Sequence, residues 1–369
     1  MTRLRSALAA FLMLVAYVAS SAATAQQSTP TTPPATSAAA SSGTIDVGKT
    51  GWTNKRPVFA AACPNGCPWG EIGEFVHDAM AKLGYDVILC RNCNRDRGPR
   101  LVSAAAIPPP LDALDVRTGT TQRFDAPVDF GVTASGILGS AYRGQGGYAA
   151  GGPLTNLRLI AKIEDPMFLL IAVKDSSGIT DLAQIKDKKM PVKILAGGGA
   201  DAVLKHYGMT RQDIAGWGGS VNGSMGAREA AEFDIIIDDS GGPAMNPESS
   251  HWPILSQRHK LRFLDVPEPV IQELAKQPGY QIVSTKWGLL QGVDRNIRTV
   301  GRSGEVIFAR ADTPDQAAYD VAKAVDQSRN DLIWLIRRYS IDPRTVSSDQ
   351  GVPLHPGAAR YYREMGYIK

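Results

Sequence analysis

The side chains with the most distinctive chemistry in this sequence are its four cysteines, which fall in two close pairs. Cys63 and Cys67 flank Pro-Asn-Gly, and Cys90 and Cys93 flank Arg-Asn. Three outcomes are open: disulfides, a four-thiolate zinc site, or free and redox-active thiols. We expect disulfides that run between the two loops, because neighbouring strands lie within disulfide reach, although the sequence does not choose among the three possible pairings.

Two polar turns are the next candidates for binding. Gly197-Gly198-Gly199 precedes a predicted helix, where bare backbone N–H groups favour a carboxylate or a phosphate. A plain glycine-rich connection with Asp201 as the helix cap is an equally weighted alternative. Asp238 and Asp239 follow a predicted strand, where they suit either the binding of a polar group or a role as turn and cap residues.

The sequence shows no arrangement typical of catalysis. It contains neither G-x-S-x-G nor H-E-x-x-H, and its five histidines share no metal-ligand spacing. Residues 43–50 fit the phosphate-loop pattern literally, but the strand before it and the helix after it are missing. We therefore expect a protein that is not an enzyme and that has no cofactor and no bound metal.

These turns can act together only if strands and helices bring them to one place. Residues 57–63 predict a short buried strand, 71–84 a helix and 85–90 a second strand, so the two strands should be parallel. Both cysteine-bearing loops would then lie at the carboxyl edge of the sheet, where open α/β sheets bind ligands. Further strands are predicted at 128–132, 157–162, 167–173, 192–195 and 233–237, further helices at 179–187, 202–206, 270–275, 315–326 and 330–339, and a loop at 139–156.

The first 25 residues indicate a secretory signal peptide. Arg3 and Arg5 precede an apolar run over 7–18, and Ala23-Thr24-Ala25 gives a small-x-small cleavage site. An uncleaved signal anchor is the alternative. Residues 26–54 are dominated by Ser, Thr, Pro and Ala in their first part and predict a disordered linker. We therefore expect a periplasmic protein.

The composition suits a globular protein, with 43% hydrophobic and 21% charged residues. The formal net charge of +4 includes Arg3 and Arg5 of the expected signal peptide. This near balance argues against a nucleic-acid partner and against a polybasic membrane-surface protein.

The C-terminal sequence VPLHPGAARYYREMG (352–366) resembles the closing PLHPGA-x-RYYRE-x-G signature of the TAXI family, the extracytoplasmic solute receptors of TRAP transporters. Residues 63–80, 129–135, 168–194 and 233–243 resemble further family segments in the same order, so the likeness spans about residues 57–369. The sequence departs from the family in the loops expected to contact the ligand: Cys63 and Cys67, then Asn92 to Arg95, then Gly198 to Ala200. The resemblance therefore implies the fold but not an inherited ligand.

The resemblance implies an α/β fold, a two-lobed periplasmic binding protein (type II-like) with a hinge between the lobes, each carrying a mostly parallel sheet. We expect a signal peptide over 1–25, a linker over 26–54, lobe 1 over 55–160 plus 300–369, and lobe 2 over 161–299. A small organic acid would bind between the lobes, and the receptor, a monomer, would deliver it to the membrane subunits of a TRAP permease. The expected ligand contacts are Asn65, Gly66, Cys67, Trp69, Asn92, Ser135, Gly198, Gly199 and Asp238.

Two other classes of protein compete with this interpretation. A periplasmic thiol, disulfide or metal-binding protein would use Cys63, Cys67, Cys90 and Cys93. An exported enzyme on a similar two-lobed fold would turn over a small acid, and the missing pair of nucleophile and base argues against it.

Overall fold

The computed structural model describes residues 51–61, 68–91, 93, 97–109, 111–114, 121–122, 124–165, 167–225, 227–228, 231–242, 250–335, 337, 339–349 and 351–369. All of these residues belong to the compact unit Ile45–Lys369. The expected signal peptide and most of the expected linker lie outside the described residues.

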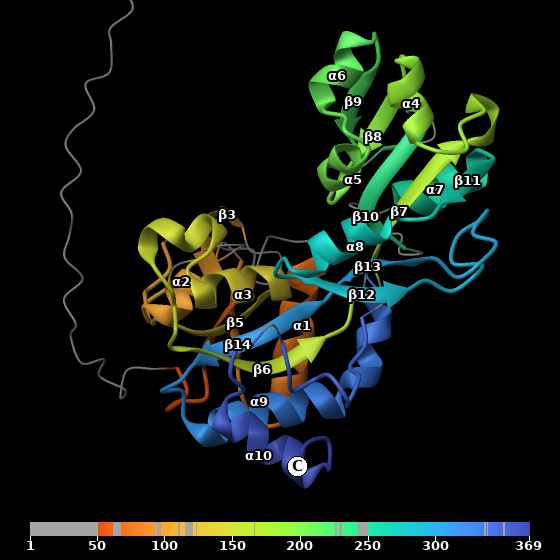
Figure 1. The fold of residues 1–369 in the computed structure, drawn as a ribbon. Coiled ribbons are helices and arrows are strands. Elements are labelled where there is room, and N and C mark those ends of the chain that lie inside the picture. The colour runs from red at the N-terminus through yellow and green to blue at the C-terminus, as the bar shows by residue number, and fades with distance from the viewer. Residues whose placement is uncertain are drawn as a thin grey trace, which may run out of the picture. The chain divides into compact units, whose positions relative to one another are not determined.

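The first sheet has five strands in the order β2-β1-β5-β14-β6 (Figure 1). The strands are β1 (Val58–Ala60), β2 (Ile88–Cys90), β5 (Val128–Ala134), β6 (Leu157–Ile163) and β14 (Glu305–Arg310). β1 is parallel to β2 and to β5, which confirms the prediction made from the strand–helix–strand pattern. β14 runs antiparallel to both of its neighbours, β5 and β6.

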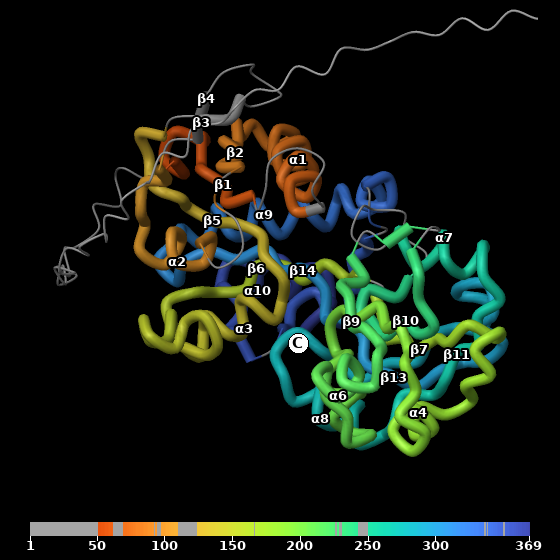
Figure 2. Tube along the Cα trace, turned by 90° about the horizontal axis from the view of Figure 1, so that it is seen from above, coloured from red at the N-terminus to blue at the C-terminus, as the bar shows by residue number. Residues whose placement is uncertain are grey.

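Helices cover both faces of this sheet, as Figures 1 and 2 show. One face packs against α1 (Pro68–Ala81), α9 (Asp315–Gln327) and α10 (Pro356–Glu364), and the other against α2 (Arg97–Ser103), α3 (Ser135–Arg143) and η2 (Gly146–Gly151). α9 packs here because its alanines and valines recur at helical spacing and are buried, while Asp315 in its first turn is exposed. The short 3-10 helix η4 (Arg329–Trp334) follows α9, and β3 (Leu111–Leu114) pairs with β4 (Thr121–Gln122) in a small ribbon.

Trp52 belongs to the core of this first sheet. Its ring centroid lies 4.9 Å from that of Phe130 and 6.2 Å from that of Tyr85. Only 7% of its surface is exposed. The predicted linker over 26–54 is therefore too long at its C-terminal end, because one large aromatic side chain is enough to bring residues 51–54 into the packed unit.

The second sheet has seven strands, six of them in the order β12-β13-β7-β10-β8-β9, and β11 pairs with β7. The strands are β7 (Phe168–Lys174), β8 (Lys193–Ala196), β9 (Ser220–Gly223), β10 (Ile235–Gly241), β11 (Leu261–Leu264), β12 (Tyr280–Ser284) and β13 (Arg298–Arg302). β8 is parallel to β9 and β10, but β7 is antiparallel to β10, β11 and β13. Four of the five strands of the first sheet and five of the seven strands of the second sheet therefore run in one direction, as predicted, and both sheets are mixed because β14, β7 and β12 run in the opposite direction.

The second sheet also carries helices on both faces. α4 (Ala183–Lys188), α5 (Ala200–His206), α6 (Arg211–Gly216) and α8 (Glu268–Ala275) pack on one face, and α7 (His251–Arg258) packs on the other. The 3-10 helix η3 (Asp175–Ser177) follows β7. α6 begins where Thr210 and Asp213 form a capping box, in which each side chain binds the other residue's backbone N–H.

Several elements differ from the sequence-based predictions. Residues 135–143 form α3, although the glycines in this stretch indicated a loop over 139–156. The predicted helix over 330–339 is only the 3-10 helix η4 over Arg329–Trp334. β12, β13 and β14 were not predicted: β12 and β13 lack a clear alternation of apolar and polar residues, and β14 is a short apolar run between two charged residues. Within the part of the chain that is described, no helix has the length and apolar character needed to cross a membrane.

The chain passes between the two sheets through two short connections, residues 164–167 after β6 and residues 303–304 after β13. The connections touch each other at Gly304, whose φ is +94°. A Cβ atom on Gly304 would lie 2.1 Å from the carbonyl oxygen of Ile163. Glu164 also forms an isolated antiparallel bridge with Ser340, so a C-terminal segment lies beside the first connection.

Gly304→Ala is expected to lower the free energy of unfolding by roughly 2–4 kcal/mol, because it adds a clash with fixed backbone to an unfavourable left-handed φ. Gly351→Ala is the matched control, since Gly351 also has a positive φ of +76° but no atom within 4 Å of the added Cβ. The control should lose only about 1 kcal/mol. Urea unfolding of both variants measures the difference, and equal losses would show that the connections are not in contact.

Candidate functional site

The candidate site is a cavity of about 210 Å³ at the carboxyl ends of β8, β9 and β10. These three strands are parallel, so their ends meet at one edge of the sheet, where open α/β sheets bind ligands. Arg302, at the end of β13, and Arg337, in the C-terminal segment, complete the wall. The described lining residues are Ala196, Gly197, Gly198, Gly223, Ser224, Met225, Asp238, Asp239, Ser240, Arg302 and Arg337.

Asp238 is a buried carboxylate whose hydrogen-bonding capacity is already used inside the protein. Ser224 donates its hydroxyl to Asp238, Nε2 of His251 lies 3.1 Å from Oδ2, and the backbone N–H of Ser240 donates to Oδ1 over 2.7 Å. Burial opposes ionisation of Asp238, but these hydrogen bonds together hold its pKa below the usual value. Asp238 therefore supplies a fixed negative charge to the wall of the cavity.

Asp239 and Arg302 form an ion pair across the cavity wall. Nη2 of Arg302 lies 3.2 Å from Oδ1 of Asp239, and the hydroxyl of Tyr280 donates to Oδ2 over 2.5 Å. Burial and the adjacent Asp239 carboxylate raise the pKa of Tyr280, so its phenol stays protonated and acts as a donor. Both oxygens of Asp239 have partners, whereas the guanidinium of Arg302 has five N–H donors and, among the described side chains, donates to Asp239.

The glycines of the predicted anion cradle lie against these two carboxylates. A Cβ on Gly197 would lie 2.4 Å from Cγ of Asp238, and a Cβ on Gly198 would lie 2.3 Å from Oδ2 of Asp239. Glycine is therefore needed at both positions for the strand β10 carboxylates to approach the backbone. The protein's own carboxylates occupy the side of this turn that was expected to receive an anion.

Arg337 links the cavity to the two connections between the sheets. Its Nη1 atom lies 3.0 Å from Oδ2 of Asp165, in the first connection, and 3.5 Å from Oε1 of Glu305, directly after the second. The indole N–H of Trp69, on α1, donates to Oε2 of Glu305 over 2.5 Å. The side chains of Arg337, Asp165 and Glu305 are 7%, 2% and 3% exposed, so this is a buried ion-pair network.

The pKa of Glu305 is raised to about 7. Burial is the main cause and the neighbouring Asp165 carboxylate adds to it, while Arg337, Trp69 and Arg302 act in the opposite direction. Two carboxylates face one arginine at this point, and with this pKa Glu305 is partly protonated near neutral pH, where an ordinary glutamate is ionised.

The structure brings together two of the residues expected to contact a ligand, Gly198 and Asp238. Trp69 contacts Glu305, which is bound to the cavity residue Arg337. Gly199 faces the core: a Cβ at this position would lie 3.0 Å from Cδ1 of Leu169 and 3.4 Å from Cδ1 of Leu274. Asn65, Gly66, Cys67 and Asn92 lie outside the described residues, so their role stays a prediction.

Ser135 is fully buried and its hydroxyl is used internally. It donates to Asp349 and accepts from the hydroxyl of Ser303 over 2.6 Å. Ser135 is absent from the described lining of the cavity. It instead fixes the start of α3 to the second connection and to the C-terminal segment.

Arg302 and Arg337, the positive groups of the site, were missed by the sequence analysis. Arg302 ends a strand that was not predicted, and Arg337 lies within the predicted helix over 330–339, where it belongs to no motif. Asp238 and Asp239 also lie within β10 rather than in the turn after it. The only sequence signal for the arginines is their type, because a guanidinium suits a carboxylate ligand.

Cys90 and Cys93 form a disulfide with each other. The predicted cross-loop pairing is therefore wrong for these two residues, since a C-x-x-C spacing at the end of β2 already brings the sulfurs within bonding reach. Both cysteines are essentially buried, at 0% and 1% exposed. A buried disulfide offers no thiolate to a metal or a substrate, which counts against the competing thiol or metal interpretation. Cys63 and Cys67 lie outside the described residues.

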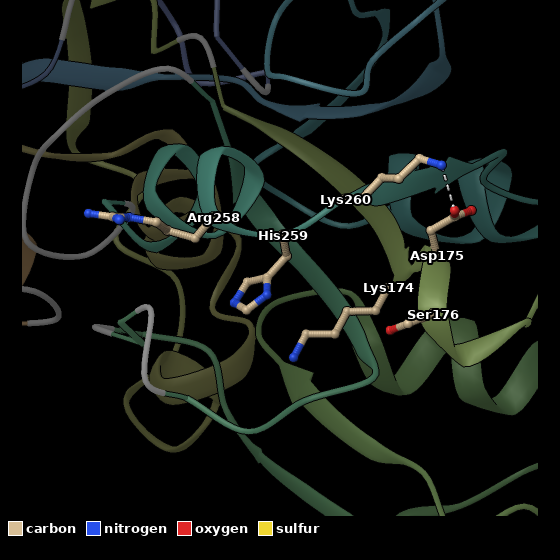
Figure 3. Close-up of a pocket in the computed structure, with 6 residues that line it drawn as sticks. All are labelled: Lys174, Asp175, Ser176, Arg258, His259 and Lys260. Carbon is tan, nitrogen blue, oxygen red and sulfur yellow. Dashed lines mark ion pairs between the residues drawn. The ribbon is translucent and has the colours of Figure 1, made fainter.

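A larger cavity, of about 350 Å³, lies at the opposite end of the second sheet, beside Lys174 at the end of β7. Figure 3 shows its side chains diverging: Lys174 and His259 point to one side, and Lys260 turns toward Asp175. Nζ of Lys260 lies 2.8 Å from Asp175, and Nζ of Lys174 lies 4.2 Å from the Phe233 ring centroid. These charged groups are used within the protein and do not converge on a ligand.

The described residues include no group of three or more His, Cys, Asp or Glu side chains that can hold a metal ion. The chemistry available in the 210 Å³ cavity is therefore hydrogen bonding and charge pairing. The cavity lies beside the junction of the two sheets, with two carboxylates and two guanidinium groups in its wall.

Two mixed sheets with helices on both faces, joined by two short connections, define the two-lobed α/β fold of solute-binding proteins, which confirms the predicted fold class. The chain belongs to the NMT1-like family, whose sequence profile matches residues 125–366.

Comparison with solved structures finds proteins of this kind at low identity. A TctC solute-binding protein from Polaromonas is 12% identical, with 85% of this chain and 98% of that chain covered and a TM-score of 0.43. MatC from Rhodopseudomonas palustris, solved with bound malate, is 12% identical over 84% and 96% of the two chains, with a TM-score of 0.40. A further R. palustris protein, solved with adipate, is 13% identical over 85% and 95%, with a TM-score of 0.36.

The raised pKa of Glu305 predicts a pH dependence of stability. Because the folded protein binds this proton more tightly than the unfolded chain, Glu305 contributes most below about pH 4.5 and its contribution is lost as the pH rises to about 7. Glu305→Gln should flatten the fall in unfolding free energy over this range by up to about 3 kcal/mol. Denaturant unfolding at a series of pH values measures it, with Glu273→Gln as an exposed control that should follow the wild type.

Proposed function

We propose that this protein is a periplasmic solute-binding receptor that captures a small organic acid and delivers it to a membrane permease of the TRAP type. Membership of the NMT1-like family supports the receptor class. The observation that carries the acid is the pair of arginines, Arg302 and Arg337, in the wall of one small cavity. Guanidinium groups bind carboxylates through directed, charge-assisted hydrogen bonds.

The C-terminal signature, residues 352–366, is the basis for the finer assignment to TAXI receptors and hence to a TRAP permease. α10 is built from this signature and begins at His355, whose Nδ1 accepts the backbone N–H of Gly357. Its conspicuous tyrosines are buried: Tyr362 donates to the carbonyl of Ile160 in β6. The signature therefore describes how lobe 1 packs, and it supports the subfamily without touching the cavity.

Two sequence features support export to the periplasm, namely the signal-like residues 1–25 and the linker that follows them. The predicted bounds were 55–160 plus 300–369 for lobe 1 and 161–299 for lobe 2. Because β6 ends at Ile163 and β13 at Arg302, we propose lobe 1 over 51–163 plus 305–369 and lobe 2 over 168–302, with the connections at 164–167 and 303–304 as the hinge. Closure around a bound acid would then be a hinge motion, selected by contacts from both lobes.

A panel of small mono- and dicarboxylates, with malate and adipate included, is expected to contain an acid that raises the Tm of the mature protein by several degrees. Binding to the folded state alone stabilises it by about 2.7 kcal/mol at a hundred times Kd. The neutral diamides of the same acids are the matched controls and should have no effect. A panel without any stabilising acid contradicts the proposed function.

Arg302→Gln is expected to weaken binding of the stabilising acid by roughly tenfold or more, because it removes a charge-assisted hydrogen bond donor from the cavity. Arg298→Gln, on the same strand, is the control, since Arg298 is exposed and paired with Glu268 outside the cavity. Isothermal titration calorimetry measures both affinities. Equal affinities in the two variants would remove Arg302 from the site.

A further inference from the structure

Arg337 is the one described cavity residue that forms direct ion pairs with the carboxylates at both connections. Asp165 lies in the connection from β6 to β7, and Glu305 is the first residue of β14 after the connection from β13. Arg302, the other arginine of the cavity, forms its direct ion pair with Asp239 of β10, in the second sheet, and acts on Asp165 and Glu305 only at longer range. Direct pairing to both connections therefore distinguishes Arg337 from Arg302.

The connections have little freedom to move independently of Arg337. Gly304 lies against the carbonyl of Ile163, and the backbone N–H of Arg302 donates to the carbonyl of Met167 over 3.0 Å. Glu164 and Ser340 exchange backbone hydrogen bonds of 2.8 and 3.3 Å beside them. A change in the position of the Arg337 guanidinium therefore changes the ion pairs at both connections at once.

We propose that Arg337 couples the cavity to the hinge: the carboxylate of an acidic solute accepts hydrogen bonds from the guanidinium of Arg337 and so weakens the ion pairs by which Arg337 holds Asp165 and Glu305. The solute contact rests on the proposed function, whereas the hold on the two connections does not. A solute without a carboxylate leaves the hold intact, which makes Arg337 a specificity-determining residue as well as a positioning one.

The charged groups around Glu305 make this coupling observable in a second way, as uptake of a proton on binding. Trp69 faces Glu305 from α1, Arg337 and Tyr339 from the C-terminal segment, Asp165 from the first connection and Arg302 from β13. The Tyr339 phenol has a pKa well above its usual value because of burial, so it carries no charge near neutral pH.

Arg337 is the strongest of the groups that lower the pKa of Glu305, a pKa of about 7. When the solute draws on Arg337, the pKa of Glu305 rises and the protein takes up a proton near neutral pH. Affinity for the acid therefore falls as the pH rises through about 7.

The first experiment uses no solute. Hydrogen–deuterium exchange is followed in residues 163–168 and 302–306 of the wild type, Arg337→Gln, Arg337→Lys and Arg344→Gln. Arg344 is the matched control, because it lies on the same segment, is 88% exposed and pairs with the neighbouring Asp342. Exchange of both connections should rise together by roughly tenfold in Arg337→Gln and not in the control.

Arg337→Lys tests the same point without stranding two buried carboxylates, since lysine keeps the charge but loses the planar fork. It should raise exchange at both connections by a smaller factor. An increase at only one connection, or at neither, overturns the hold.

The second experiment uses malate and adipate as probes, in buffers of different ionisation enthalpy. The wild type should bind with net proton uptake at pH 7 and lose affinity severalfold between pH 6 and pH 8. Arg337→Gln should lose roughly tenfold in affinity. Glu305→Gln should bind without proton uptake, because the titrating carboxyl is gone.

The outcomes separate the two claims. A wild type that binds neither probe contradicts the proposed function for these acids and overturns the solute contact, while the exchange experiment still decides whether Arg337 holds the connections. If Arg337→Gln binds a probe as tightly as the wild type, or if the wild type binds it without proton uptake, the coupling is overturned and the receptor function still stands.

Discussion

The buried pairing of Arg337 with Asp165 and Glu305 is the interaction on which the organisation of this protein depends. Charges removed from water must be paired, and leaving one partner alone in the interior typically costs about 3–5 kcal/mol. Here the three charges come from three separate segments, namely the first connection, the start of β14 and the C-terminal segment. The C-terminal segment is therefore needed at the junction of the sheets, although its helix α10 packs only in the first lobe.

The cavity follows from the same balance of charge. Asp238 and Asp239 lie in β10, with glycines opposite them. Ser224 and His251 bind the carboxylate of Asp238, and Tyr280 and Arg302 bind that of Asp239, so most of the hydrogen-bonding capacity of both carboxylates is used. The carboxylates are thus part of the wall, and the Arg302 guanidinium has more N–H donors than its pairing with Asp239 uses. Under the proposed function, this guanidinium binds the carboxylate of the solute.

The sequence was informative where structure is local. The buried strand, helix and strand at the start of the folded region were predicted because their apolar residues recur at the periods of a strand and a helix, and their parallel pairing follows from the short crossover. Gly198 and Asp238 were found because glycine and aspartate after strands mark a ligand-binding edge. The site arginines were not found, since Arg302 and Arg337 reach the cavity through tertiary contacts that leave no periodic pattern. The disulfide prediction was wrong because it favoured a long-range contact between the two loops over the local C-x-x-C pairing of Cys90 with Cys93.

The position of β14 has a consequence for how the chain matures. It is the strand between β5 and β6, yet its residues, 305–310, come after every strand of the second sheet. A growing polypeptide thus makes the whole second lobe before the first sheet has the strand that joins its two halves. The second lobe is continuous in sequence and can fold as one unit during synthesis. The first sheet stays incomplete until residues 305–310 have been synthesised.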